Sequence, residues 1–213
     1  MKISKKVGII GVALTLFVTS ACSQLGFVKE RKSVPLNNNI ANSKVYRYLK
    51  SFEVMDSAEL KGQIVTNVDN NQVVTDFACI KDNNRKLSYL KSSDIIAWAE
   101  YTDGRNNYAL NMNEKSYEQI DNLSLDTYSE LNDLFNSAIA CEDYGNNEII
   151  YVYNEGLNVN CYVDCRLSDK GVVLVMLDKD NKETGKMFTL QVSSIKQSDI
   201  GLLSLDGYTE QKE

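Results

Sequence analysis

Short runs of β-branched and aromatic residues, separated by turns rich in Asn, Asp and Gly, are the feature that most limits how this chain can fold. Each run has the length and composition of a β-strand. Asp103-Gly104, between two of the runs, is a strong signal for a tight hairpin. Because no helical segment separates neighbouring runs within a group, each group predicts an antiparallel meander. The first group occupies residues 60–68, 72–80, 85–90, 94–101, 107–112 and 116–120, and the second occupies 148–154, 157–167, 172–177 and 186–195.

Two other segments have the 3.6-residue period of amphipathic helices. Residues 40–55 and 125–140 each carry one apolar stripe, and each has a capping residue near its start: Ser43 for the first, and Ser124 or Asp126 for the second. The stripes consist of Val45, Tyr48, Leu49 and Phe52, and of Tyr128, Leu131, Leu134, Phe135 and Ala138. The order helix, meander, helix, meander predicts an α+β fold, in which a curled antiparallel β-sheet, or half-barrel, is covered by two or more α-helices.

The N-terminus has the composition of an export signal. Three lysines, Lys2, Lys5 and Lys6, precede a continuous apolar run over residues 7–18. That run suits a signal peptide and is shorter than the roughly 20 apolar residues of a membrane-spanning helix. We therefore expect the chain to be exported.

The sequence VTSACSQ (residues 18–24) resembles the bacterial lipobox, although Thr19 stands where leucine is most common. This resemblance implies that Cys22 is acylated and becomes the new N-terminus. An ordinary secretory signal with a cysteine downstream by chance is the alternative. The expected organisation is a signal peptide over 1–21, a lipidated flexible tether over 22–39 and a half-barrel domain over 40–213, held on the extracytoplasmic face of a bacterial membrane through its lipid anchor.

Composition excludes several classes of function. The chain contains no histidine, which removes the Ser-His-Asp and Cys-His nucleophile pairs and the histidine-containing zinc sites. Removing the three signal-peptide lysines from the 23 basic residues leaves 20 against 29 acidic ones, a formal charge of −9. A chain with this negative charge does not indicate the basic surface that binds the phosphates of nucleic acid. We assign no catalytic residue, no metal ligand and no cofactor.

Four cysteines remain besides Cys22. Cys161 and Cys165 are four residues apart in one predicted strand, about 13 Å along it, which is too far for a disulfide between them. Their alternation places both on one face, as small core residues. The alternative is that one or both pair with Cys79 or Cys141, and spacing does not choose among the connectivities.

The layout resembles the LolA/LppX superfamily of lipoprotein carriers and lipid-binding lipoproteins, whose fold is a curled half-barrel closed by helices. YTDGRNNYALNMNEKSYEQI (101–120) is similar to the strand pair of that superfamily, with its D-G turn and Lys-x-Tyr strand. LLSLDGYTE (202–210) is similar to its C-terminal signature through Gly207 and Tyr208, with Leu202 and Leu205 in place of Phe and Pro.

This resemblance implies an apolar cavity that binds acyl chains. Such a cavity would be lined by apolar residues of the predicted strands, or these would form an ordinary core. The candidates are Ile64, Phe77, Trp98, Tyr108 and Leu110.

Within the superfamily, the lipobox, the size and the Asn/Lys-rich composition resemble those of clostridial spore-germination lipoproteins. That resemblance implies a non-enzymatic protein of the cell or spore envelope that binds and supports a peptidoglycan (cortex) amidase, an N-acetylmuramoyl-L-alanine amidase. Exposed strand edges would serve binding by strand addition or by formation of a homodimer. The alternative function is a lipid or lipophile carrier that uses the concave face.

Overall fold

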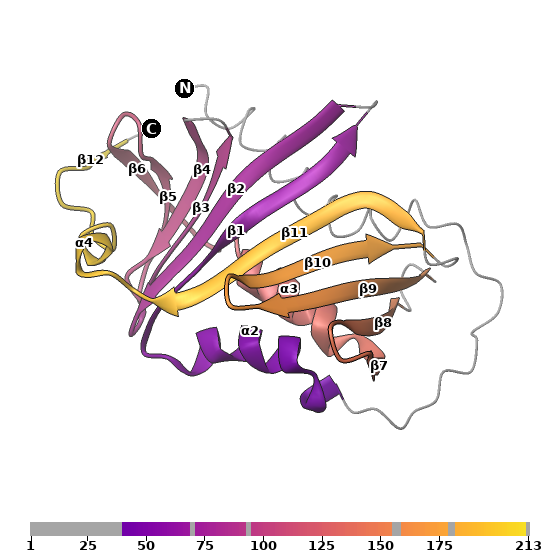
Figure 1. Ribbon diagram of the computed structural model, residues 1–213. Coiled ribbons are helices and arrows are strands. Elements are labelled where there is room, and N and C mark those ends of the chain that lie inside the picture. The colour runs from indigo at the N-terminus through magenta and orange to yellow at the C-terminus, as the bar shows by residue number, and fades with distance from the viewer. Residues whose placement is uncertain (1–39, 69–70, 93–94, 155–158, 179–181, 212–213) are drawn as a thin grey trace.

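A single curled sheet of twelve strands dominates the computed structural model, which describes residues 40–68, 71–92, 95–154, 159–178 and 182–211 (Figure 1). The strand order is β12-β6-β5-β4-β3-β2-β1-β11-β10-β9-β8-β7, and every neighbouring pair is antiparallel except β12 with β6. The first half contains β1 (Ser57–Val68), β2 (Asn71–Asp82), β3 (Arg85–Ser92), β4 (Ile95–Thr102), β5 (Asn107–Asn111) and β6 (Ser116–Ile120). The second half contains β7 (Ala138–Asp143), β8 (Glu148–Asn154), β9 (Val159–Ser168), β10 (Gly171–Leu177), β11 (Glu183–Ser194) and β12 (Thr209–Glu210).

Pairing between β1 and β11 joins the two meanders into this one sheet. The pairing runs over nine residues, from Ala58 opposite Ser194 to Thr66 opposite Lys186. β1 also pairs along its whole length with β2. The expected order of helix, meander, helix and meander is therefore confirmed, and the ends of the two meanders meet in the middle of the sheet.

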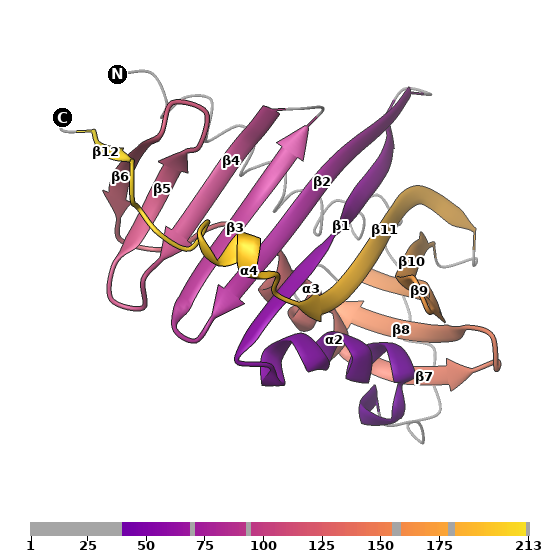
Figure 2. The same ribbon diagram turned by 60° about the vertical axis from the view of Figure 1, so that its left-hand side comes forward.

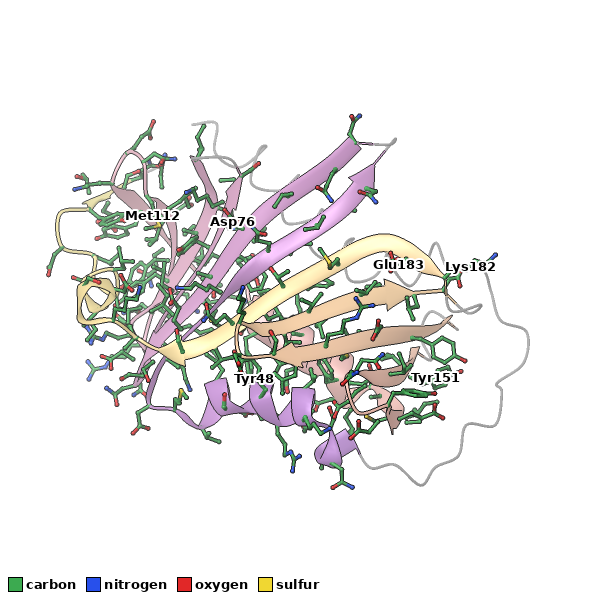
Figure 3. All side chains as sticks on the ribbon, in the orientation of Figure 1. Tyr48, Asp76, Met112, Tyr151, Lys182 and Glu183 are labelled. Carbon is green, nitrogen blue, oxygen red and sulfur yellow. The ribbon has the colours of Figure 1, made fainter. Side chains whose placement is uncertain are left out.

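Helices α2 (Lys44–Val54) and α3 (Thr127–Asn136) cover one face, which we call the helix-bearing face (Figures 1 and 2). The predicted stripe of α2 buries Val45, Leu49 and Phe52 there, and its Tyr48 reaches β11, where the hydroxyl accepts a hydrogen bond of 2.8 Å from the Val192 N–H (Figure 3). Ser43 caps α2 as predicted, since its side chain accepts from the Tyr46 N–H. Two short helical segments, η1 (Ile40–Asn42) and α4 (Gln197–Ile200), complete the described helices.

The second predicted helix is shorter than expected. It is capped by Asp126 and ends at Asn136, and Ala138 begins strand β7. The sequence predicts a helix up to residue 140 because Ala138 and Ala140 suit either a helix or a strand. Pairing of β7 with β8 decides the outcome, since it satisfies backbone groups that a further helical turn would have bonded internally.

The C-terminal segment covers the opposite side of the sheet, which we call the outer face. Leu203 is fully buried there beside Ile80, Leu87 and Tyr101. Its carbonyl accepts hydrogen bonds from the Tyr101 hydroxyl at 3.2 Å and from the Arg85 guanidinium at 3.3 Å. Further along, β12 pairs with the edge strand β6. We call residues 201–211 the C-terminal strap. They show no strand or helix period, so the sequence predicts no element there.

Gly62 allows β1 to approach β11 closely at the bend of the sheet. A Cβ atom there would lie 1.7 Å from the Thr189 carbonyl oxygen and 3.1 Å from the Cζ atom of Phe77. The backbone oxygen cannot move without breaking the β1–β11 ladder. The Phe77 ring from β2 fills the space that a side chain at position 62 would take.

We predict that Gly62→Ala lowers the free energy of unfolding by about 3 kcal/mol, because the new methyl group collides with backbone. For a domain of this size the melting temperature should fall by about 6–12 °C. The control is Gly201→Ala, where φ is −62° and the nearest atom is 3.8 Å from the added carbon. Thermal unfolding followed by circular dichroism measures both. Equal melting temperatures for the two variants would contradict the prediction.

Candidate functional site

Three of the five predicted cavity residues lie together on the helix-bearing face. Ile64 on β1, Phe77 on β2 and Trp98 on β4 belong to one cluster of buried apolar side chains, which also contains Leu131 and Phe188. The register connects them, since Phe77 lies opposite Leu90, which in turn lies opposite Trp98. The cluster continues beneath α2 and α3, so these three residues are packed as core.

The other two predicted residues lie on the outer face. Tyr108 is opposite Tyr101 in the β4–β5 hairpin, and the two rings stack with centroids 6.0 Å apart. Leu110 packs in the same small cluster, beneath the C-terminal strap. The five residues therefore do not line one space. The sequence contains the signal that places Trp98 and Tyr108 on different faces. A tight hairpin at Asp103-Gly104 puts Tyr108 opposite Tyr101, and side chains alternate along a strand, so Tyr101 and Trp98 point to opposite faces.

Polar atoms are buried within the helix-bearing core. Among the described residues, the Trp98 Nε1–H and the Thr127 hydroxyl are enclosed with no hydrogen-bond partner. Lys186 on β11 is only 5% exposed and holds its ammonium 5.3 Å from the centre of the Phe188 ring. Buried polar groups of this kind are uncommon in a purely structural core, so this part of the interior is the one most suited to a ligand with a polar end.

Glu130 on α3 lies close enough to Lys186 for the lysine charge to lower the pKa of its carboxyl. Burial is the largest cause that raises the pKa of the Glu130 carboxyl from its ordinary value of 4.5 to about 7. The neighbouring Asp126 and Asp133 contribute in the same direction, and Lys186 opposes them. Near neutral pH this carboxyl therefore exists as a mixture of its charged and neutral forms.

Two buried glutamates tie the helices to the sheet. Glu148, at the start of β8, accepts hydrogen bonds from the Ser43 hydroxyl at 2.5 Å and from the Lys44 N–H at 2.7 Å, where α2 begins. Glu100 on β4 accepts from the Ser124 N–H and the Leu125 N–H, both at 2.7 Å, just before α3. Each carboxylate satisfies backbone donors that have no partner within a helix. Sequence reasoning missed both, since a single acid in a strand gives no local signal.

The cysteines act as core residues. Cys79, Cys141 and Cys165 are buried free thiols, and burial raises the pKa of the first two to about 11. A thiol with such a pKa is not a nucleophile at neutral pH. The core interpretation is confirmed for Cys165, and the alternative of a disulfide to Cys79 or Cys141 is wrong because both are free. The side chain of Cys161, like Cys22, lies outside the described residues.

One edge of the sheet is open. β7 pairs with β8 on one side, and no described strand lies on its other side, whereas the opposite edge strand, β6, is partly covered by β12. The β7–β8 hairpin carries Glu142 and Asp143, both exposed, and Tyr144, whose side chain is 61% exposed. Asp143 pairs with Lys44 at 2.8 Å. An edge strand beside an exposed tyrosine is a suitable surface for another protein.

A separate hollow of about 290 Å³ opens over β1, β10 and β11, beside the β9–β10 turn. Its polar lining includes Lys61, Lys170 and Gln191, and none of the predicted cavity residues reaches it.

Within the described ranges, no group of three Cys, Asp or Glu side chains is arranged to hold a metal ion, and no helix has the length and apolar character needed to cross a membrane.

No protein-family model matches the sequence, and no curated protein matches it significantly. Among solved structures, the chain is similar to an uncharacterized conserved protein from Thermus thermophilus at 5% identity, covering 79% of this chain and 98% of that one with a TM-score of 0.41. It is also similar to a LolA superfamily protein from Nitrosomonas europaea, at 9% identity, 76% and 96% coverage and a TM-score of 0.37. A DUF1329 family protein from Desulfovibrio piger matches at 9% identity, 81% and 100% coverage and a TM-score of 0.28. Similarities at this level leave the function to be argued from the chain itself.

We predict that Glu130→Gln stabilises the protein at pH 8 and has no effect at pH 4. Because the pKa of Glu130 is raised in the folded state, the stability linked to its proton is complete below pH 4.5 and is lost as the pH rises through about 7. Glutamine stays neutral and removes that loss. Melting temperatures between pH 4 and pH 8 provide the measurement. A shift of the same size at every pH would contradict a titration effect.

Proposed function

We propose that this chain is a lipid-anchored, non-enzymatic lipoprotein of the bacterial envelope that works by binding another protein. The β7 edge is the observation that carries this proposal, because no described strand pairs with its outer side, whereas β12 partly covers the opposite edge of the sheet. The packed interior beneath α2 and α3 supports it as well, since three of the residues suggested for a cavity contribute to the core instead.

The partner we propose is a peptidoglycan amidase of the spore cortex, an N-acetylmuramoyl-L-alanine amidase. This choice rests on the resemblance to the clostridial spore-germination lipoprotein GerS, through the lipobox at Cys22, the size and the Asn/Lys-rich composition. In that role the protein would sit on the extracytoplasmic face of the forespore or spore membrane. It would support the amidase without performing chemistry of its own.

Strand addition at β7 is the binding mode that fits the geometry. The partner's strand would extend the sheet beyond β7, and Tyr144 at the hairpin would contribute a large side chain of the type that dominates many interfaces. Glu142 beside it makes this end of the edge acidic, so a basic segment of the partner would be favoured.

Lipid binding on the helix-bearing face is the second candidate. It is favoured by the Trp98 Nε1–H and the Thr127 hydroxyl, two buried donors without a partner among the described residues. A lipid headgroup or ester oxygen would satisfy them, and the apolar side chains of Ile64 and Phe77 would contact its chain.

Native mass spectrometry of the mature chain, alone and with the amidase, separates the two candidates. We expect a complex with the amidase and no lipid at stoichiometric amount. Tyr144→Ala should weaken the complex by about tenfold or more, as expected for an exposed aromatic residue that becomes buried in an interface.

The matched control is Leu202→Ala, which removes another exposed apolar side chain, 40% exposed, from the segment after α4. It should leave the affinity unchanged. Co-purified lipid with no amidase complex would favour the second candidate and overturn the first. Equal losses of affinity for the two variants would show that the β7–β8 hairpin is not part of the interface.

Membrane attachment is tested by Cys22→Ser. We expect the variant to fold with an unchanged melting temperature, because residue 22 lies outside the domain that begins at Ile40. It should leave the membrane fraction, since the acyl chains would no longer be attached. Sedimentation of membranes from the expressing cells checks this. A variant that still sediments with them would show that the lipobox interpretation is wrong.

A further inference from the structure

A band of apolar side chains crosses the outer face of the sheet on the strands that the C-terminal strap does not reach. The residues that adjoin its members along β1, β11, β10, β9 and β8 belong to the helix-bearing core. Because side chains alternate along a strand, the members themselves point to the outer face. We call this group the apolar band. It consists of Val65, Met187, Val175, Leu177, Tyr162 and Tyr151.

The register makes the band continuous across the strands. Met187 on β11 lies opposite Val65 on β1, and on its other side it lies opposite Val175 on β10. Leu177 follows on the same strand as Val175 and lies opposite Tyr162 on β9. Tyr162 in turn lies opposite the tyrosine of β8. The band therefore runs from the middle of the sheet to within one strand of the β7 edge.

The band is enclosed, although its residues belong to neither of the two cores of the described chain. Val65 and Val175 are each 7% exposed, and Tyr151 (Figure 3) is 3% exposed. Tyr162 shields one side of Tyr151, with ring centroids 4.9 Å apart. The neighbour on the other side is Ala140, which is too small to shield a tyrosine ring. A tyrosine on a bare sheet face would expose much of its ring, so a further layer covers this end of the band.

The segment before Ile40 has the length and the starting point to supply that layer. Every other range outside the described residues contains four residues or fewer. η1, which begins at Ile40, contacts β7, so the segment starts beside the tyrosine end of the band. Residues 23–39 span about 60 Å when extended, whereas the five strand spacings from β7 to β1 amount to about 24 Å. The segment is therefore long enough to cross the whole band.

Composition indicates which part of this segment would bind. The residues before Cys22 have the composition of an export signal, which is removed during secretion. The remaining part is polar at its end next to the domain, where three asparagines stand at 37–39. Between these two parts, residues 25–36 carry large apolar side chains that an apolar surface would take up. They are Leu25, Phe27, Val28, Val34 and Leu36.

We propose that residues 25–36 dock on the apolar band, so that part of the expected tether forms an outer layer of the domain. The segment would pass around the flank of the sheet near η1. An extended chain is about 5 Å wide, whereas β7, with six residues, is about 20 Å long. The crossing therefore leaves most of the β7 edge available to a partner strand.

Docking would also decide how the domain is held at the membrane. Two residues separate Cys22 from Leu25, so an anchor at Cys22 would keep the outer face within about 10 Å of the bilayer. The helix-bearing face would then point away from the membrane. This consequence rests on the proposed membrane attachment, whereas the docking itself does not.

The docking is tested on the mature sequence with Cys22→Ser, which carries no acyl chains and needs no membrane. One variant combines Leu25→Asp with Phe27→Asp. The matched control combines Asn37→Asp with Asn38→Asp, which adds the same charge to the same segment at polar positions. We expect the melting temperature to fall by about 4–8 °C in the first variant, because two buried apolar side chains are lost, and to stay unchanged in the control. Equal melting temperatures for the two variants would overturn the proposal.

A double-mutant cycle locates the contact. In a chain that also carries Tyr151→Ser, the Leu25→Asp and Phe27→Asp pair should lower the melting temperature by less than half as much as it does alone. Val175→Thr, which changes the shape of the side chain little, provides a second background if Tyr151→Ser does not fold. An undiminished shift in these backgrounds would overturn docking on the band. A melting temperature that rises with protein concentration, together with a dimer in light scattering, would assign the cover to a second copy of the chain and also overturn the proposal.

Discussion

The pairing of β1 with β11 is the interaction on which the rest of this structure depends. Each meander alone would end in open edges, and this one ladder joins them into a twelve-stranded sheet. It brings strands from the two ends of the domain together, so its loop-closure cost is large and must be offset by burial on both sides. Gly62 lets the two backbones approach at the bend, and Phe77 covers the gap that results.

Once the two meanders are joined into one sheet, polar contacts decide where the helices lie. Apolar stripes alone would allow α2 and α3 to slide along the helix-bearing face, because hydrophobic burial is not directional. The buried carboxylates of Glu148 and Glu100 remove that freedom by accepting backbone N–H groups at fixed points near the start of each helix. Replacing either carboxylate would leave buried donors unsatisfied, a cost greater than the loss of one exposed hydrogen bond.

Local features of the sequence predicted most of the elements, and non-local pairing decided the rest. Ser43 and the Asp103-Gly104 turn were found because capping and hairpin formation depend on a few adjacent residues. Strand β7 was missed because its alanines suit a helix equally well. The cavity prediction grouped Tyr108 with Trp98, although the β4–β5 hairpin register places the two side chains on opposite faces of the sheet. Ile96 and Trp98 are two residues apart, so strict alternation predicts that they share a face. A bulge between β3 and β4 breaks the alternation and places Ile96 on the face opposite Trp98.

The β7 edge lies on the flank of the sheet, beside the start of α2, because Asp143 pairs with Lys44 there. Glu148 of the same hairpin accepts the Lys44 N–H, so the hairpin and the start of the helix are held together. A strand added beyond β7 would therefore meet an edge whose position the helix already fixes, and ordering that edge would add little to the cost of binding.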